Sequence, residues 1–424
     1  MQSNCSFLIQ HIILAVQQKD ISQGRMDSGH SKIRMNVEGD RLSGLPDDII
    51  HKILSFINTK QAVQTSVLSP RWRYTWTSVP CLSISYSNFR TQAKFSKFVT
   101  RVLSGRNNQI ELSSVELTFR GKVCGEFVKK ILNKVLKYAF SHNVQHLDIT
   151  NGRPGKSTEF PISHFSSQSL KHLTLVGFGH KDSITTPFTW DLLALTTLDL
   201  WYVTLWYDDN DKSAGLFSNC PNLKNLSVSH CHIVGSNGFY ICHPGLSNLT
   251  LEEGDTYGDV VTPQLKSLTI RNWPKMRLIS APNLASLHYE ADHEPLRLSS
   301  ELLHLETVDM CIFHPYVVDP EAHKIVSLLQ QLRSVKFLTL NLELIEILSS
   351  SVELISHQPS PFANLKSLKI LPELYTNPDS WFFWEDEEQT QPKVTAMCTQ
   401  VKNYLLDGSP GATFTMVTPE VCTQ

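Results

Sequence analysis

Residues 246–251 read Leu-Ser-Asn-Leu-Thr-Leu, residues 265–270 read Leu-Lys-Ser-Leu-Thr-Ile, and residues 284–289 read Leu-Ala-Ser-Leu-His-Tyr. In all three stretches the first, fourth and sixth positions hold large apolar or aromatic side chains. The last two of these positions are two residues apart, which is the period at which side chains return to the same face of a β-strand. Each stretch is therefore predicted to contain a short strand with one buried face.

The pattern Leu-x-x-Leu-x-Leu, with aliphatic substitutions, recurs ten times along the chain. Most copies are about 19 to 30 residues apart, the spacing typical of leucine-rich repeats, whose stacked strands bury one continuous core. The uneven spacing predicts irregular convex segments rather than uniform helices. The ten copies begin at Val144, Leu170, Leu195, Leu223, Leu246, Leu265, Leu284, Leu305, Val335 and Leu365.

Residues between the leucines are expected to point to a concave face, where a target can bind. Among them are His172, Thr174, Thr197, Asp199, Ser227, Thr250, Thr269 and His288. From strand phase alone, four side chains are candidate contacts with a target protein: Trp201, Arg271, His288 and Glu290.

A different pattern precedes the repeats, in residues 40–76. Apolar residues at positions 45, 49, 50, 53, 54 and 57 form a helical stripe. Residues 60–67 are predicted to form a second helix. Ser69 and Pro70 have the types favoured at a helix start and predict a third helix carrying Trp72 and Trp76.

Three short helices in about 40 residues cannot bury their own apolar faces well. This helical unit is therefore expected either to dock on a neighbouring domain or to offer a face to a partner helix.

The segments that flank the repeats are of mixed type. Residues 95–103 and 127–140 have helical periodicity, and residues 115–119 alternate as a strand does. Near the end, Trp381–Glu388 is aromatic and then acidic, which is typical of a solvated insertion. Residues 394–405 form a last helical stripe and residues 414–417 a closing strand, and together they are expected to cap the repeats.

Composition narrows the function. The chain has 424 residues with a formal net charge of -2, which favours neither nucleic acid nor an anionic membrane as partner. Nine scattered cysteines without a Cys-x-x-Cys pair indicate reduced thiols in the cytoplasm and/or nucleus. No segment reaches the roughly 18 apolar residues of a membrane span. Residues 1–39 are expected to be a poorly ordered leader.

Three motifs resemble ligand-binding or metal-binding sites, but we interpret them as structural. Gly155-Lys156-Ser157 lacks the earlier glycine of a phosphate-binding loop, because position 150 is Thr150. His230-Cys231-His232 with Cys242-His243 has no standard zinc spacing. Asp208–Asp211 lacks the glycine and distal glutamate of a calcium loop. No catalytic residue, metal or cofactor is predicted.

Residues 40–76 resemble the F-box of the plant F-box/leucine-rich-repeat family. The resemblance lies in Asp40-Arg41-Leu42-Ser43, Leu45-Pro46-Asp47, Ile53-Leu54-Ser55-Phe56, Thr65-Ser66-Val67-Leu68-Ser69 and Arg71-Trp72-Arg73 with Trp76. The repeats and the tail Val401–Leu406 are more loosely similar to the same family.

The resemblance implies a non-catalytic subunit of a cullin-based ubiquitin ligase. The F-box would dock on a Skp-type adaptor and, through it, a cullin, while the repeats would hold a protein substrate of unknown identity. The residues implied in adaptor binding are Leu45, Pro46, Ile49, Ile53, Leu54, Leu68 and Trp72. The alternative is a ligase-independent binding scaffold, in which the helical unit would dock on the first repeats and leave no free face.

The expected fold class is α/β: a small all-α F-box helical unit followed by an irregular leucine-rich-repeat solenoid (horseshoe) with a C-terminal cap. The expected division is a leader (1–39), an F-box (40–80), and a linking segment that includes the N-terminal cap of the solenoid (81–143). The repeats (144–371) and an acidic insertion with the C-terminal cap (372–424) follow.

Overall fold

The structure is a computed structural model, and it describes residues 44–121, 123–152, 158–159, 167–177, 184–185, 191–206, 217–234, 238–273, 276–291, 296, 298, 302–312, 319–371 and 397–417. The chain divides into two compact units. Unit 1 comprises Met1–Pro187 and Asp191–Thr204, and unit 2 comprises Phe188–Trp190 and Leu205–Gln424. Among the described residues, no helix combines the length and the apolar character needed to cross a bilayer.

Unit 1 begins with the predicted helical unit. Helix α2 (Asp47–Leu54) follows Pro46 and has two aspartates in its first turn, where carboxylates stabilise the helix dipole. Helix α3 (Thr59–Gln64) starts with a capping box, in which Asn58 and Gln61 satisfy each other's backbone amides. The 3-10 helix η1 (Thr65–Val67) extends α3 by one turn.

The predicted third α-helix is wrong. After Pro70 the chain forms turns and the short 3-10 helix η2 (Thr75–Ser78). Backbone amides there bond three residues back, as Trp72 N does to Ser69 O at 3.1 Å. Trp72 and Val79 are both buried in one core, and the first strand of the sheet begins only two residues after Val79. A continuous α-helix over this short segment would not satisfy both constraints.

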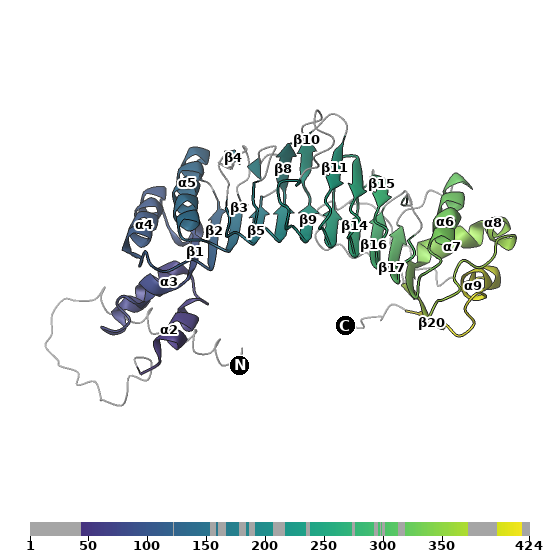
Figure 1. The fold of residues 1–424 in the computed structure, drawn as a ribbon, viewed down its shortest axis with the longest axis horizontal. Helices are drawn as coiled ribbons and strands as arrows, with labels where there is room; N and C mark the ends of the chain where they lie inside the picture. The colour runs from purple at the N-terminus through teal and green to yellow at the C-terminus, as the bar shows by residue number, and fades with distance from the viewer. Residues whose placement is uncertain are drawn as a thin grey trace. The chain divides into compact units, whose positions relative to one another are not determined.

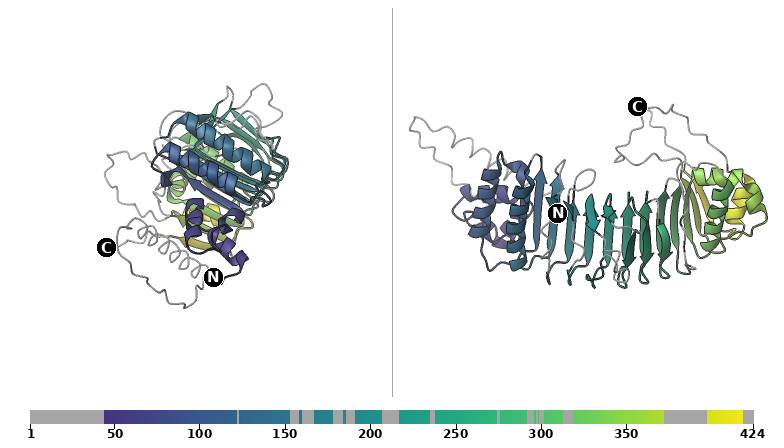
Figure 2. Two further views of the ribbon diagram at one scale, coloured as in Figure 1. Left: turned by 90° about the vertical axis from the view of Figure 1, so that its left-hand side faces the viewer. Right: turned by 90° about the horizontal axis from the view of Figure 1, so that it is seen from above.

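The rest of unit 1 is a parallel sheet with helices on one face. Strands β1 (Cys81–Ser85), β2 (Ser114–Arg120), β3 (His146–Gly152), β5 (His172–Val176) and β7 (Thr197–Trp201) pair in that order. The 3-10 helix η3 (Tyr86–Asn88) follows β1, and helices α4 (Gln92–Gly105) and α5 (Gly125–Ser141) lie side by side over this sheet (Figure 1 and Figure 2). Short strands β4 (Thr158–Glu159), β6 (Ile184–Thr185) and β8 (Val203–Trp206) form a second ladder.

Unit 2 repeats the same construction. Its main parallel strands are β9 (Asn225–Ser229), β12 (Asn248–Glu252), β14 (Ser267–Arg271), β16 (Ser286–Ala291), β17 (Thr307–Ile312), β18 (Phe337–Asn341), β19 (Ser367–Leu371) and β20 (Thr413–Met416). Strand β10 (His232–Val234) follows β9, and β11 (Phe239–Cys242), β13 (Gly258–Val261) and β15 (Met276–Ser280) form a second parallel ladder. Helices α6 (Asp319–Gln331), α7 (Leu342–Ser350), α8 (Val352–Ser356) and α9 (Thr399–Leu406) gather near β17 to β20 (Figure 1).

The core of each sheet follows from strand register. Leu249 lies beside Leu268, which lies beside Leu287, so that equivalent apolar side chains stack from strand to strand. All three side chains are buried. Each of the ten predicted repeat strands is present, and the predicted closing strand corresponds to β20. The architecture is thus mixed α/β, with parallel strands that bury one face.

Some segments were not anticipated or lie outside the description. Strand β1 and helices α6, α7 and α8 had no counterpart in the predictions. The leader, Gly155-Lys156-Ser157, Asp208–Asp211 and Trp381–Glu388 lie outside the described residues.

A packing contact in unit 2 gives the first testable prediction. A Cβ atom on Gly254 would lie 2.2 Å from the buried Trp273 ring, whereas a Cβ on Gly411 would meet no atom within 4 Å. We expect Gly254→Ala to destabilise the protein by about 1–3 kcal/mol, because the ring must move from a packed site. Gly411→Ala is the matched control, and denaturant unfolding is the measurement. Equal stability of the two variants would show that Trp273 does not pack on Gly254.

Candidate functional site

The helical unit (residues 44–80) has its own apolar core. Ile50, Ile53, Leu54, Ile57, Ala62, Trp72 and Val79 are buried together, and Leu45, Leu68, Trp76 and Cys81 pack against them. Among these, Trp72 is completely buried. Most of the apolar residues in this stretch therefore hold the unit together.

A second set of side chains points outward from α2. Ile49 is 47% exposed and Phe56 is 53% exposed, and Pro46 is exposed at the start of the helix. Ile49 and Lys52 are three residues apart on α2 and therefore share one face of the helix, and Phe56 follows two residues after the helix ends. Lys52 Nζ lies 5.3 Å from the centre of the Phe56 ring. We call Ile49, Lys52 and Phe56 the α2 outer face.

An ion pair fixes the start of α2 to the turn that follows α3. Arg71 Nη2 donates to Asp47 Oδ1 at 2.7 Å, and this contact lowers the pKa of the Asp47 carboxyl. Both side chains are exposed, so the pair contributes little stability. Its effect is to orient the two segments that carry Pro46 and Trp72.

The opposite side of the helical unit is attached to the sheet of unit 1. Thr59 Oγ1, in the first turn of α3, accepts the backbone N–H of Ser83 at 3.0 Å. This N–H points away from β2, so the threonine occupies the outer edge of β1. Lys60 Nζ donates to Asn88 O at 2.9 Å and lies 5.1 Å from the centre of the Phe89 ring.

Arg106 makes a second attachment. This residue follows α4, is buried, and its Nη2 donates to Val79 O. Burial lowers the pKa of the guanidinium. Next to it, Asn107 N donates to Thr77 O at 3.1 Å. The helical unit is therefore attached at α3 and at residues 77–79, and the α2 outer face is exposed.

The structure separates the seven residues expected to contact an adaptor. Ile53, Leu54 and Trp72 are buried in the core, so in this structure they are not exposed on the surface of the unit. Leu45 and Leu68 are half-buried against that core. Pro46 and Ile49 are exposed, and for them adaptor contact stays a prediction.

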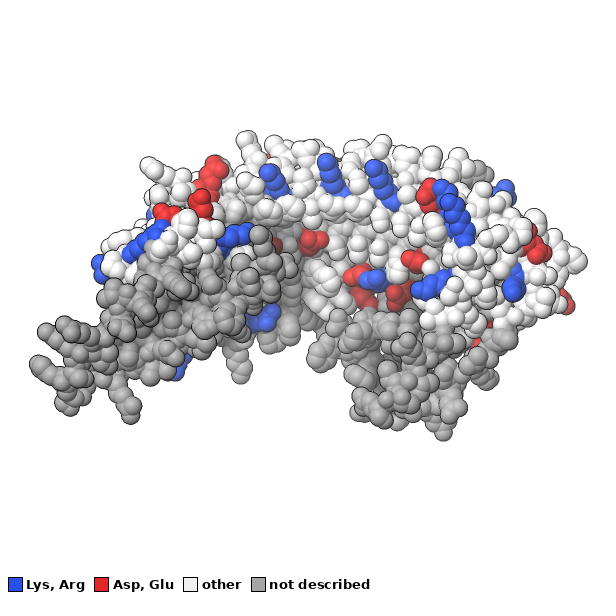
Figure 3. All heavy atoms as spheres, turned by 90° about the horizontal axis from the view of Figure 1, so that it is seen from below, with Lys and Arg blue, Asp and Glu red and all other residues white. Residues whose placement is uncertain are grey.

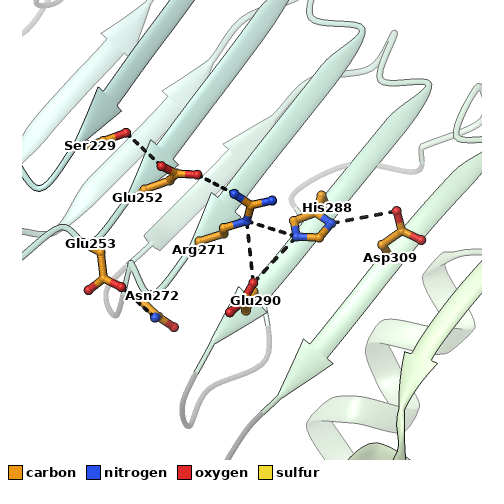
Figure 4. A network of polar contacts seen from close by, with 8 residues as sticks. All are labelled: Ser229, Glu252, Glu253, Arg271, Asn272, His288, Glu290 and Asp309. Carbon is orange, nitrogen blue, oxygen red and sulfur yellow. Dashed lines mark hydrogen bonds and ion pairs between the residues drawn. The ribbon is translucent and has the colours of Figure 1, made fainter. Parts of the chain in front are cut away.

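Unit 2 contains a network of polar side chains on the exposed face of its sheet (Figure 4). Arg271 Nη1 donates to Glu252 Oε1 at 2.7 Å, and Arg271 Nε lies 3.6 Å from Glu290 Oε2. Ser229 Oγ donates to the other oxygen of Glu252 at 3.0 Å. These residues come from β9, β12, β14 and β16, and their register places them in one row across the sheet.

His288 joins this row to the next strand. Its Nδ1 lies 3.8 Å from Asp309 Oδ2 on β17, and its Nε2 lies 3.8 Å from Glu290 Oε2. The two carboxylates raise the pKa of His288 to about 9, and His288 in turn lowers the pKa of Asp309.

The protonation state of His288 determines whether the 3.3 Å contact between Arg271 Nε and His288 Nε2 is a hydrogen bond. An imidazolium has no acceptor nitrogen, so in the protonated ring both groups are donors and share Glu290 Oε2. At neutral pH the row therefore alternates carboxylate and cation across four strands. At its edge, the amide of Asn272 donates to Glu253 Oε1 at 2.8 Å.

Three of the four predicted target contacts thus meet in one network: Arg271, His288 and Glu290. Trp201 lies in unit 1, at the exposed end of β7. Nearby in that sheet, the rings of His146 and His172 stack with centres 4.4 Å apart.

The residues of the rejected zinc pattern have structural contacts. Cys231 is buried and its Sγ donates to Ser229 O at 3.3 Å. His243 is also buried, with Nε2 donating to Cys220 O at 2.9 Å and Nδ1 accepting from Gly245 N at 3.2 Å. His232 Nδ1 lies 2.6 Å from Asp255 Oδ2.

The residues of these surfaces that sequence reasoning missed include Lys52, Phe56, Ser229, Glu252 and Asp309. Phe56 was noted only as part of the F-box resemblance. Glu252 and Asp309 share strand phase with Arg271 and His288, so the same alternation that selected those two residues would have found them.

The contact between Thr59 and Ser83 gives a prediction. Thr59→Val keeps the side-chain shape but removes the acceptor, so we expect a loss of about 1–2 kcal/mol and faster hydrogen exchange at the Ser83 amide. Thr100→Val, on the exposed face of α4, is the control: it removes solvent-exposed hydrogen bonds to Ser96 O and from Lys134 Nζ and should leave exchange at Ser83 unchanged. Unchanged exchange at Ser83 in the Thr59 variant would contradict the edge contact.

The pKa of His288 predicts a pH dependence of stability. Because the folded pKa is raised above 6.5 to about 9, the ion pairs stabilise fully below pH 6.5 and are lost as pH rises through 9. We expect the protein to lose about 1–2 kcal/mol across this interval, after screening by solvent. His288→Gln should remove that slope in a comparison of melting temperatures from pH 6 to 10. A slope that persists in the variant would assign it to another group.

Comparison with known proteins matches both parts of the chain. Residues 42–83 match the F-box domain, and residues 132–370 match the LRR repeats of FBD-associated F-box protein At5g56370. The chain is 33% identical over 241 residues to F-box/LRR-repeat protein At3g26922 of Arabidopsis thaliana, which covers 55% of this chain and 76% of that protein.

Two further Arabidopsis thaliana proteins are similar over part of their length. Putative F-box/LRR-repeat protein At3g18150 is 32% identical over 197 residues, 45% of this chain and 38% of that protein. Putative F-box/FBD/LRR-repeat protein At4g13965 is 31% identical over 223 residues, 52% of this chain and 49% of that protein. On the strength of a repeat match that spans more than half of its length, the chain belongs to the plant F-box/leucine-rich-repeat family.

Proposed function

We propose that this protein is the substrate-recognition subunit of a Skp–cullin–F-box type ubiquitin ligase. F-box domains generally bind Skp-type adaptors, and through the adaptor the chain would reach a cullin. The repeats would bind the protein to be ubiquitinated. The observation that carries the proposal is the α2 outer face, whose apolar side chains Ile49 and Phe56 are exposed while the rest of the helical unit is attached to β1.

The proposed role needs no catalytic group in this chain. A receptor of this kind accelerates transfer by holding the substrate near the ligase, which raises the effective concentration of substrate lysines. The polar network of unit 2 fits a binding role, because its carboxylates and cations lie on an exposed sheet face. We propose that the protein is located in the cytoplasm and/or nucleus. Imaging of a fluorescent fusion would test this localisation.

We also infer that the repeats form an irregular solenoid with a C-terminal cap. Support comes from α9, whose Val401, Tyr404 and Leu405 are buried, and from the hydrogen bond of Gln330 Nε2 to Tyr404 OH at 3.1 Å. Ser409 Oγ also donates to Phe362 O at 2.8 Å. These contacts join α9 to α6 and Ser409 to the segment before β19, and in this position α9 would cover the apolar core of the last repeats as a terminal cap does.

The adaptor interface is tested by charge substitution on the α2 outer face. We expect Ile49→Asp and Phe56→Asp each to weaken binding of a Skp-type adaptor at least about tenfold. In the complex, each substitution would place a carboxylate where an apolar side chain becomes buried, and desolvation of that carboxylate is costly. Both side chains are exposed, so the fold should be retained, which circular dichroism can check. Phe337→Asp, a similarly exposed aromatic on β18, is the matched control for adaptor affinity.

Adaptor affinity measured by calorimetry separates the two functional hypotheses. Tight binding by the unaltered protein and by Phe337→Asp, with loss in the two α2 variants, supports the ligase subunit. A protein that binds no Skp-type adaptor would instead be a ligase-independent scaffold.

A further inference from the structure

One exposed aromatic side chain stands on the sheet face of unit 2. Phe337, the first residue of β18, is 45% exposed. Its neighbours in register are Thr307 on β17 and Ser367 on β19, followed by Thr413 on β20. The aromatic ring is therefore flanked by small hydroxyl-bearing side chains, and a partner side chain can contact it.

Lysines occupy positions next to Phe337 in sequence and on the neighbouring strand. Lys366 and Lys369 on or beside β19 are exposed, and Lys336 directly precedes Phe337. Lys336 is paired with Glu306 at 2.5 Å, and that pairing lowers the pKa of the glutamate. Lys366 and Lys369 are exposed and form no ion pair within 4.0 Å among the described residues, although their charges act at longer range on Glu306 and Asp309. We call Phe337, Lys366 and Lys369 the β18–β19 patch.

Positive charge continues along the same unit. Figure 3 shows Lys and Arg side chains aligned along one edge of this face, and Lys224 and Lys266 occupy the same position of their repeats as Lys366. In the polar network, Arg271 is 47% exposed whereas the side chain of its partner Glu252 is 15% exposed. Within the described part of the chain, Arg271 Nη2 makes no hydrogen bond. Its outward N–H groups can therefore bind an anion.

We propose that the sheet face of unit 2 binds an acidic polypeptide segment that carries an apolar or aromatic side chain. The apolar side chain packs on Phe337, and carboxylates of the segment pair with Lys366, Lys369 and Arg271. This inference rests on the proposed receptor function and names the class of substrate that this face recognises.

The interleaved carboxylates favour a peptide over a nucleic acid. Glu252, Glu306 and Asp309 lie among the cations, and they would repel a backbone that carries one negative charge per nucleotide. A peptide can place acidic side chains opposite the cations and uncharged residues or N–H groups opposite the carboxylates, whereas every nucleotide carries a phosphate. The face therefore fits separated carboxylates better than a continuous row of phosphates.

The apolar anchor is necessary because exposed ion pairs are weak. Charge pairs at lysines open to solvent contribute little and are screened by salt. Aromatic residues, in contrast, are frequent hot spots where they become fully buried in an interface. Phe337 is thus expected to set affinity, and the lysines to select acidic partners.

The test uses the full-length protein and a fluorescent synthetic peptide of 12 residues in which Phe is flanked by Asp and Glu, followed by anisotropy. We expect binding that weakens about tenfold in Phe337→Ser and about tenfold in the double variant Lys366→Glu/Lys369→Glu. The matched control is Lys130→Glu/Lys137→Glu, two exposed lysines on α5, which should stay within about twofold. A peptide with Lys in place of its acids should not bind.

Each of the following results would overturn the proposal. Equal loss in the α5 control would mean non-specific attraction, and unchanged affinity in Phe337→Ser would remove the anchor. Tighter binding of a 12-nucleotide single strand than of the peptide would assign the face to nucleic acid. Adaptor binding is measured on the same samples, so a protein that binds adaptor but not peptide would contradict this inference alone.

Discussion

The open edge of the parallel sheet in unit 1 is the constraint on which the rest of that unit depends. A first strand has no neighbour on its outer side, and its unpaired N–H and C=O groups invite unwanted pairing. Here the hydroxyl of Thr59 accepts the outward N–H of Ser83, and Arg106 donates to the carbonyl of Val79 just before β1. The helical unit thus covers the edge, and this attachment determines which of its faces is exposed.

This arrangement resolves how a short helical unit divides its apolar residues. Ile50, Ile53, Leu54 and Trp72 form the core, α3 contacts β1, and Ile49 and Phe56 remain outside. A free face and a docked face exist together, which the two functional hypotheses had treated as exclusive. It also means that removing residues 40–80 would uncover β1, so single substitutions are the cleaner way to study partner binding.

The fold was largely predictable because its signals are local. Alternation of period two in Leu-x-x-Leu-x-Leu found all ten repeat strands, and helical stripes found α2, α3 and α5. The third helix failed because the placement of Trp72 and Val79 in one core overrode a proper start signal at Pro70. Strand β1 was missed because Cys81–Ser85 is short, with only Leu82 and Ile84 buried, and because its pairing with β2 is a tertiary property.

The candidate sites were only partly predictable for a different reason. A family resemblance marks positions but not which side of a helix they occupy, so buried Ile53 and exposed Ile49 looked equivalent. The ion-pair row of unit 2 needs the register of strands about 20 residues apart in sequence, which places Glu252, Arg271 and Glu290 beside one another. The alternation of side chains within each strand could predict only that these residues lie on the same face of the sheet.

The most direct test of this account is site-specific photo-crosslinking in the complex with a Skp-type adaptor. A photoreactive phenylalanine analogue at position 56 should capture the adaptor, and the same analogue at position 60, on the side of α3 that contacts Asn88 and Phe89, should capture only this chain. Capture of the adaptor from position 60 but not from position 56 would contradict the claim that the α2 outer face is the docking surface.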